Sequence, residues 1–224
     1  MANLFQDRTE AGQVLTGRLE YLARRPDVLV LALSRGGTPV AAEVARELRA
    51  PLDVFLVRPL GIPGHEELAM GAVTPGGVLV VNEQVMRQND VSEGTLNKAA
   101  MTEGRELERR EKICREDRPP VEVAGRIVIL TDDGRASSVT LRAAIVALRQ
   151  LEPSGIILGL PVAAPDLCAE LETEVEQIVC LENQEPQYAV GLYYRHYPAV
   201  TDEEVCEMLR QSAEDLREPP GGSI

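Results

Sequence analysis

The sequence contains no tryptophan, few other aromatic side chains, two histidines and four cysteines. The cysteines lie far apart, with no Cys-x-x-Cys pair and no histidine at ligand spacing, so the sequence indicates neither a zinc site nor a disulfide framework. They are expected to be reduced thiols, mostly in the core, as in a cytoplasmic protein: Cys114, Cys168, Cys180 and Cys206.

Long apolar runs and a signal peptide are also missing. No segment has the roughly 18 consecutive apolar residues that a membrane-spanning helix needs, and residues 1–7 lack a basic stretch followed by an apolar run. We therefore expect a soluble, cytoplasmic protein with no membrane partner.

Positive charge is scarce, because 36 aspartates and glutamates outnumber 23 lysines and arginines and give a formal net charge of −13. Such a protein repels the phosphate backbone of nucleic acids, and no nucleic-acid partner is expected. A small phosphorylated ligand is compatible with this charge, since it needs only local backbone N–H groups, one or two arginines and a cation.

What the sequence does contain is an alternation of apolar, strand-length runs and amphipathic helices. The expected strands cover residues 28–33, 53–57, 126–130, 155–162 and 177–181. Strands this apolar predict an α/β fold with a mostly parallel central sheet and helices on both faces. We expect a single domain over residues 1–217 and a disordered tail at 218–224. Ligands bind such sheets at the carboxyl ends of strands, so functional residues should follow strands directly.

Other elements are expected outside this sheet. Residues 72–81 predict a projecting hairpin, and residues 93–118 predict a charged surface or lid helix. Thr201 and Glu204 form a capping box, which predicts the start of a last helix.

The strongest motif covers residues 127–141, where an apolar strand ends in Asp132 and Asp133 and a loop rich in small and hydroxyl residues leads into a helix. The carboxylates can accept hydrogen bonds from a vicinal diol. Ser137, Ser138, Thr140 and the N–H groups at the helix start can hold a phosphate. The same pattern also fits a polar turn without a ligand, in which Asp133 caps the loop and a serine caps the helix.

A second motif, Ser34-Arg35-Gly36-Gly37, follows the first expected strand. Two glycines let the backbone approach a ligand closely, and the Arg35 guanidinium suits a pyrophosphate. A Gly-Gly turn with a solvated arginine is the alternative interpretation.

The segment 127–141 resembles the phosphoribosyl-pyrophosphate (PRPP) binding motif of type I phosphoribosyltransferases, which is an apolar strand, two acidic residues and then Thr-Gly-x-Thr. Ser137 and Thr140 match the two threonines, while Ser138 departs from the glycine. The resemblance implies that the acidic pair contacts the ribose hydroxyls and that residues 136–140 wrap the 5′-phosphate. The implied ribose and 5′-phosphate site comprises Asp132, Asp133, Gly134, Ala136, Ser137, Ser138, Val139 and Thr140.

The second motif resembles the pyrophosphate loop of the same family, for which the resemblance implies a non-proline cis peptide beside Arg35. Residues 53–73 resemble an uncharacterised bacterial branch of this family, in which Arg58 matches the first of two basic residues and Pro59 stands where lysine is usual. The implied pyrophosphate site comprises Ser34, Arg35, Gly36, Gly37 and Arg58. His65, between a glycine and two glutamates, is expected to be solvated.

The resemblance extends over residues 4–216 and implies a mobile lid at about 60–120 and a small C-terminal hood at about 182–200. Within the hood, Tyr188 is a candidate for stacking on a base, with a core position as the alternative.

The implied reaction transfers the 5-phosphoribosyl group of PRPP to a nitrogenous acceptor, such as a nucleobase, and releases pyrophosphate. Arg35, Asp132 and Asp133 are the candidate catalytic residues. Mg²⁺ is the expected cofactor, held mainly by ligand oxygens and water with at most help from Asp132 and Asp133. Homo-oligomerisation is expected by analogy with the family.

Two other functions remain open. Ser138 and Pro59 alter ligand-contact positions, which suits a PRPP- or nucleotide-binding regulator without turnover. A phosphohydrolase with Asp132 or Asp133 as nucleophile lacks a second acidic motif with lysine and threonine partners.

Overall fold

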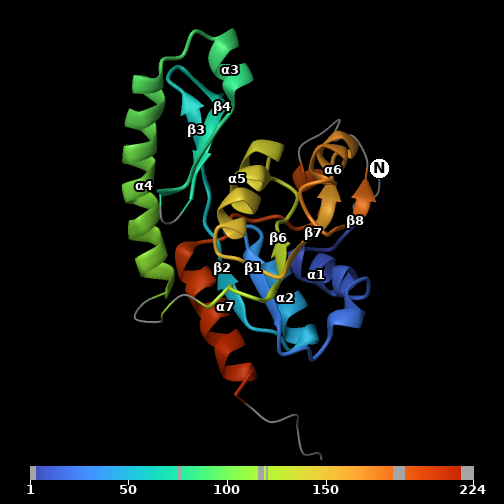
Figure 1. Ribbon diagram of the computed structural model, residues 1–224. Coiled ribbons are helices and arrows are strands. Elements are labelled where there is room, and N and C mark those ends of the chain that lie inside the picture. The colour runs from blue at the N-terminus through green and yellow to red at the C-terminus, as the bar shows by residue number, and fades with distance from the viewer. Residues whose placement is uncertain (1–3, 75–76, 116–118, 120, 184–189, 218–224) are drawn as a thin grey trace, which may run out of the picture.

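The computed structural model describes residues 4–74, 77–115, 119, 121–183 and 190–217 (Figure 1). Its centre is a five-stranded, entirely parallel sheet in the order β2-β1-β6-β7-β8. The strands are β1 (Val28–Ala32), β2 (Leu52–Val54), β6 (Ile127–Thr131), β7 (Gly155–Ala163) and β8 (Gln177–Asn183). The predicted α/β fold with a mostly parallel central sheet is therefore confirmed.

Helices cover both faces of this sheet (Figure 1). One face packs against α1 (Arg8–Thr16), a short 3-10 helix (Glu20–Leu22), α2 (Thr38–Leu48) and α7 (Asp202–Asp215). The other face packs against α5 (Ser138–Arg149) and α6 (Pro165–Leu171). Because both faces are covered, every residue of β1 and β7 is buried, which explains their unbroken apolar sequences.

The helix starts are set by local capping. Asp7 accepts a hydrogen bond at the start of α1 and Ser137 does so at the start of α5. Thr201 and Glu204 form the predicted capping box of α7. No described helix is long and apolar enough to cross a membrane.

The order of the central strands reverses next to β1. The chain leaves β1 for β2 on one side, and β6 returns on the other side of β1. Loops that follow the two strands at such a switch point diverge from each other in direction and leave a crevice at the carboxyl edge of the sheet. The two loops here are residues 33–37 and residues 132–137. The crevice that they border is the usual ligand position in sheets of this type.

A second sheet projects beyond the central one, built from β3 (Arg58–Ile62), β4 (His65–Val73) and β5 (Leu79–Val81) in antiparallel order (Figure 1). It packs with α3 (Glu83–Gln88) and α4 (Glu93–Arg115) around a small apolar core that includes Leu60, Met70 and Leu96. The sequence predicted the β4–β5 hairpin and the helix, but not β3. The predicted strand at 53–57 is shorter, because the chain leaves the central sheet after Val54 and runs toward β3.

Candidate active site

The two predicted loops contact each other through Ser34. Its hydroxyl donates to Asp132 Oδ1 over 2.6 Å, while the Gly37 N–H donates to the Ser34 hydroxyl over 3.0 Å. One serine thus links the loop after β1 to the acidic pair after β6.

The glycines of the loop after β1 are required by this contact. A Cβ on Gly36 would lie 2.3 Å from Asp133 Oδ2, and one on Gly37 would lie 2.9 Å from the Asp132 Cα. The sequence attributed these glycines to close approach of a ligand, but they first allow the loop to lie directly on the acidic pair.

The acidic pair itself is buried, with Asp132 0% and Asp133 1% exposed. Asp132 Oδ2 accepts hydrogen bonds from the N–H groups of Gly134 (3.1 Å) and Ala136 (2.8 Å). Burial, together with the charge of Asp133, raises the pKa of Asp132 to about 6, although hydrogen bonds from Ser34 and these two amides oppose the shift. Asp132 therefore organises the turn that follows β6.

Asp133 is held by side chains that the sequence did not nominate. Arg8 Nε donates to its Oδ2 over 2.9 Å, and the Tyr197 hydroxyl donates to the same oxygen over 2.7 Å. The Tyr194 hydroxyl donates to the Asp133 carbonyl over 2.8 Å. A signal for Arg8 was present, because it lies three residues before Ala11 and so shares the buried face of that helix.

The predicted phosphate-binding residues form the first turn of α5. Ser137 caps this helix, where its hydroxyl accepts from the Thr140 N–H over 3.3 Å and lies 3.0 Å from the Thr140 hydroxyl. Ser138 is the first residue of the helix and is half-buried. The helix cap that the sequence offered as an alternative interpretation is thus present. The start of α5 also places the hydroxyl groups of Ser137 and Thr140 near the acidic pair.

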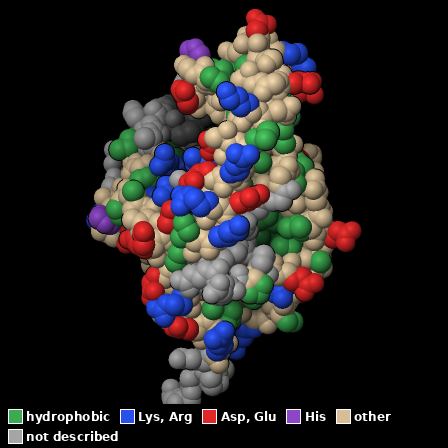
Figure 2. Space-filling view, turned by 90° about the vertical axis from the view of Figure 1, so that its left-hand side faces the viewer, with side chains coloured by type: hydrophobic (Ala, Val, Ile, Leu, Met, Phe, Trp, Pro, Cys, Tyr) green, Lys and Arg blue, Asp and Glu red, His purple; other side chains and the backbone are tan. Residues whose placement is uncertain are grey.

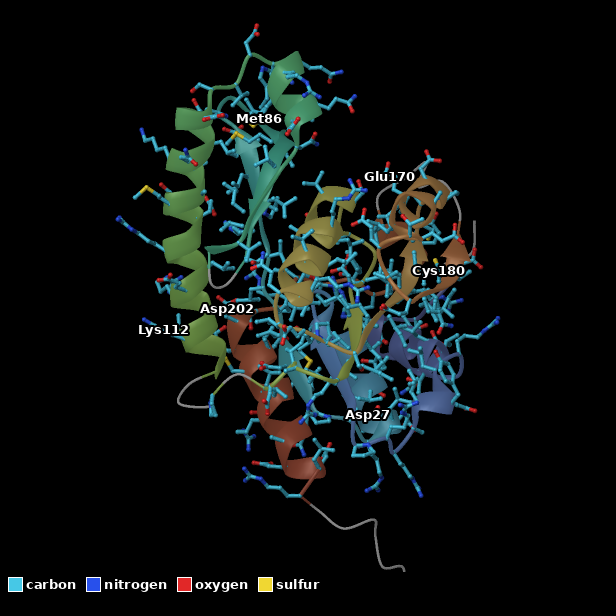
Figure 3. All side chains as sticks on the ribbon, viewed as in Figure 1. Asp27, Met86, Lys112, Glu170, Cys180 and Asp202 are labelled. Atoms are coloured by element: carbon cyan, nitrogen blue, oxygen red, sulfur yellow. The ribbon has the colours of Figure 1, made fainter. Side chains whose placement is uncertain are left out.

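The predicted arginines are paired with carboxylates. Arg58 Nε lies 2.7 Å from Glu103 Oε2 of α4, and Arg35 Nη1 lies 3.5 Å from Asp202 Oδ1. Figure 3 shows Asp202 at the start of α7, next to α4. The face that bears α4 mixes basic and acidic side chains, so no large area of one sign covers it (Figure 2).

A cavity of about 330 Å³ lies where these groups meet. Of the predicted residues, those that line it are Ser34, Arg35, Gly36, Arg58, Asp132, Asp133, Ala136 and Thr140. The other predicted residues belong to the same two loops and to the start of α5 but do not line the cavity: Gly37, Gly134, Ser137, Ser138 and Val139. The sequence missed several other lining residues, among them Arg8, Leu107 and Arg135. No ion pair joins Arg135 to another residue that the structure describes.

The described residues contain no cis peptide bond, so the peptides beside Arg35 are trans and that expectation is wrong. The loop closes instead as a trans turn, in which the Thr38 N–H donates to the Arg35 carbonyl over 3.1 Å, and avoids the roughly 3 kcal/mol cost of a non-proline cis bond. His65 is exposed, as expected. Tyr188 lies outside the described residues.

The fold is a parallel α/β sheet with an acidic pair, a glycine loop and a hydroxyl-rich helix start at its switch point, an arrangement whose N–H and hydroxyl groups suit a phosphate. Residues 10–195 match the model of the phosphoribosyl transferase domain. The chain belongs to this family.

Similar proteins agree with this assignment. Two relatives come from Mycobacterium tuberculosis, strains CDC 1551 and H37Rv, and their names describe them as proposed phosphoribosyl transferases. Each is 37% identical to this chain over 215 residues, which are 96% of this chain. The chain spans about half of their length, 48%. The crystal structure of the protein TT1426 from Thermus thermophilus is also 37% identical, with a TM-score of 0.78 over 92% of this chain and 98% of that one.

Proposed function

We propose that this protein transfers the 5-phosphoribosyl group of PRPP to a nitrogenous acceptor, such as a nucleobase, with release of pyrophosphate. The observation that carries the proposal is the shared cavity. The two loops that resemble PRPP-binding motifs come from strands far apart in sequence, and both line one cavity at the switch point.

Each part of PRPP has a matching group around this cavity. The first turn of α5, with Ser137 and Thr140, offers N–H and hydroxyl groups to the 5′-phosphate. The carboxylates of Asp132 and Asp133 accept hydrogen bonds from the ribose hydroxyls. The pyrophosphate lies against residues 34–37 and Arg58, where phosphate oxygens replace the carboxylate partners of the arginines.

The residues fit Mg²⁺ only as an ion that enters with the substrate. Among the described residues no three histidine, cysteine or acidic side chains gather as metal ligands, and the oxygens of Asp132 already accept three hydrogen bonds. PRPP oxygens and water would therefore supply most ligands, with Asp132 and Asp133 nearby. The ion would offset negative charge on the departing pyrophosphate.

In the reaction the acceptor nitrogen attacks C1 of the ribose with its lone pair. The bond between C1 and the pyrophosphate oxygen breaks, its electron pair leaves with pyrophosphate, and the acceptor nitrogen loses a proton to solvent. Arg35 and the N–H group of Gly36 stabilise the charge that develops on the leaving group, while the Gly37 N–H holds the Ser34 hydroxyl. Leu107, Ala199 and Val200 give the cavity an apolar wall suited to a flat, uncharged acceptor.

A second candidate function is a PRPP- or nucleotide-binding regulator without turnover. Its support is Pro59, which lines the cavity at a position where the resemblance to the bacterial branch implies lysine, so that the pyrophosphate site has one cation fewer. The phosphohydrolase alternative loses support, because both carboxylates are buried and hydrogen-bonded rather than free to attack a phosphate.

The deciding experiment combines isothermal titration of PRPP, in the presence of Mg²⁺, with a pyrophosphate-release assay across nucleobases. We expect binding, with release when the correct base is present. Binding without release for any base would favour the regulator, and absence of binding would refute both the transferase and a PRPP-binding regulator. Ser138→Gly restores the family residue and should maintain or raise PRPP affinity.

A further inference from the structure

Arg8, the first residue of α1, has a buried side chain that is 7% exposed. Its Nε donates to Asp133 Oδ2 over 2.9 Å, and its Nη1 donates to the Pro198 carbonyl over 2.8 Å. Its guanidinium carbon lies 3.7 Å from the centre of the Tyr197 ring. Arg8 is therefore fixed by two hydrogen bonds and a cation–π contact.

Two tyrosines complete the arrangement around Asp133. The Tyr197 hydroxyl donates to the same carboxylate oxygen as Arg8, and the Tyr194 hydroxyl donates to the Asp133 backbone carbonyl. The two tyrosine rings stack with 4.9 Å between their centres. The backbone and one carboxylate oxygen of Asp133 are thus held by side chains from two segments that are far apart in the sequence.

The two carboxylate oxygens of Asp133 are occupied unequally. Oδ2 accepts from Arg8 and Tyr197, whereas the hydrogen bond to Oδ1 comes from the Arg135 N–H at 3.3 Å, which is long. A carboxylate oxygen can accept more than one hydrogen bond, so Oδ1 retains capacity for a further donor. Asp133 and Arg8 both line the cavity.

We propose that Arg8 and Tyr197 are positioning residues, which hold Oδ2 of Asp133 so that its Oδ1 accepts a hydrogen bond from a ribose hydroxyl of the substrate. The inference rests on the proposed function. A carboxylate that is fixed before binding loses less conformational freedom when the sugar arrives. A buried ion pair is by itself weak evidence for stability, because desolvation opposes the attraction. An orienting role accounts for a buried charge at this place.

The test measures sugar recognition separately from stability. Ribose 5-phosphate and its 2-deoxy and 3-deoxy forms are titrated into the intact chain, and the ratio of dissociation constants reports the contribution of each hydroxyl. We expect the wild-type protein to prefer ribose 5-phosphate to at least one deoxy sugar by about tenfold, the effect of one hydrogen bond to a charged group.

Tyr197→Phe removes the hydroxyl but retains the ring beneath Arg8, and it should lower this preference at least about threefold, as expected for partial loss of such a bond. Arg8→Lys keeps the charge without the planar fork and should act in the same direction. Tyr21→Phe is the matched control, because the Tyr21 hydroxyl bonds Gln177 outside the cavity; it should leave the preference unchanged.

The outcomes distinguish failure of the positioning role of Arg8 and Tyr197 from failure of the proposed function. If folded Tyr197→Phe and Arg8→Lys proteins keep the wild-type preference, Arg8 and Tyr197 are only a structural brace and the inference is wrong. The same follows if the wild-type protein binds PRPP but does not distinguish the three sugars. If it binds neither PRPP nor any of these sugars, the proposed function itself fails.

Discussion

Asp132 and Asp133 are adjacent and equally buried, yet their surroundings differ. Asp133 forms an ion pair with Arg8, whereas the oxygens of Asp132 accept from a hydroxyl and two amides. From the sequence alone, both carboxylates have the same expected role as one acidic pair. In the structure, Asp132 joins the loop after β1 to the loop after β6. Asp133 joins the loop after β6 to α1 and to residues 194–197.

The raised pKa of Asp132 leads to a prediction about stability and pH. The folded state holds the Asp132 proton more tightly than the unfolded state between pH of about 4 and 6. The contribution of Asp132 to the free energy of unfolding should therefore be fully present below this window and fall by about 2 to 3 kcal/mol as pH rises through it. Urea denaturation of the wild type and of Asp132→Asn from pH 4 to 7.5, without divalent ions, gives the free energy of unfolding of each protein. The wild-type value minus the variant value should fall as pH rises. A difference that stays constant or rises would contradict the raised pKa of Asp132.

The close contact at Gly36 predicts a second effect. Gly36→Ala places a methyl group 2.3 Å from Asp133 Oδ2, so the loop must shift, at a cost of about 1 to 3 kcal/mol. We expect a lower free energy of unfolding and weaker PRPP binding in calorimetry. Gly104→Ala is the matched control, because its methyl group meets nothing within 4 Å and alanine is favoured in a helix by about 0.5 to 1 kcal/mol. Equal behaviour of the two variants would show that the loops are not in contact.

At the scale of single residues, the sequence predicted the two loops that meet at the cavity but not the side chains that hold them. Ser34, Asp132 and the glycines were found because each follows a strand. Arg8 and Tyr197 were missed because their partner lies 125 and 64 residues away in sequence. Such pairings depend on how the elements pack rather than on a local pattern.

At the scale of elements, α4 is joined to the candidate pyrophosphate site through the pair between Glu103 and Arg58. Both side chains are partly exposed, so solvent weakens the pair. A pyrophosphate at Arg58 would share its guanidinium with the carboxylate of Glu103, and α4 therefore competes with the ligand for this arginine.

This competition predicts that Glu103→Gln raises PRPP affinity by about two- to fivefold, the scale of an exposed ion pair. Titration calorimetry at low and high salt measures the effect, which should shrink as salt screens the pair. Glu106→Gln removes a partner of Arg109 on the same helix and serves as the control with wild-type affinity. A loss of affinity in Glu103→Gln would mean that Glu103 orients Arg58 for the ligand instead.

The central strands were predictable because burial on both faces requires continuous apolar runs. β3 was not, since Pro59 and Gly61 are unusual in strands. The early end of β2 was also hidden, because Phe55, Leu56 and Val57 continue the apolar run and pack on the core clusters, although the strand ends at Val54.

At the scale of the whole molecule, the chain brings residues 4–8 and 190–198 together over the carboxyl end of the sheet. Phe5 pairs with Tyr194 in an isolated bridge, and the Arg195 and His196 N–H groups donate to the carbonyls of Phe5 and Gln6. Both segments contact Asp133. The candidate site thus depends on contacts among several distant segments.

A ligand at such a site should stabilise the entire fold. At a PRPP concentration 100 times its dissociation constant, mass action adds about 2.7 kcal/mol, which for a domain of this size raises the melting temperature by about 5 to 10 °C. Differential scanning calorimetry with Mg²⁺ and PRPP measures the shift, and Mg²⁺ with ribose alone is the control. An unchanged melting temperature at concentrations that saturate the calorimetric titration would place binding on a segment that unfolds separately.

The pairing of β1 with β6 also has a consequence for the order of folding. Val28 lies beside Ile127, so the two strands that carry the ligand loops meet only after almost a hundred intervening residues have been gathered into position. Contacts of such long range form slowly, because the entropy of closing the loop is lost before the contact stabilises anything. A chain emerging from the ribosome has its glycine loop long before its acidic pair, and the candidate site is assembled only near the end of folding.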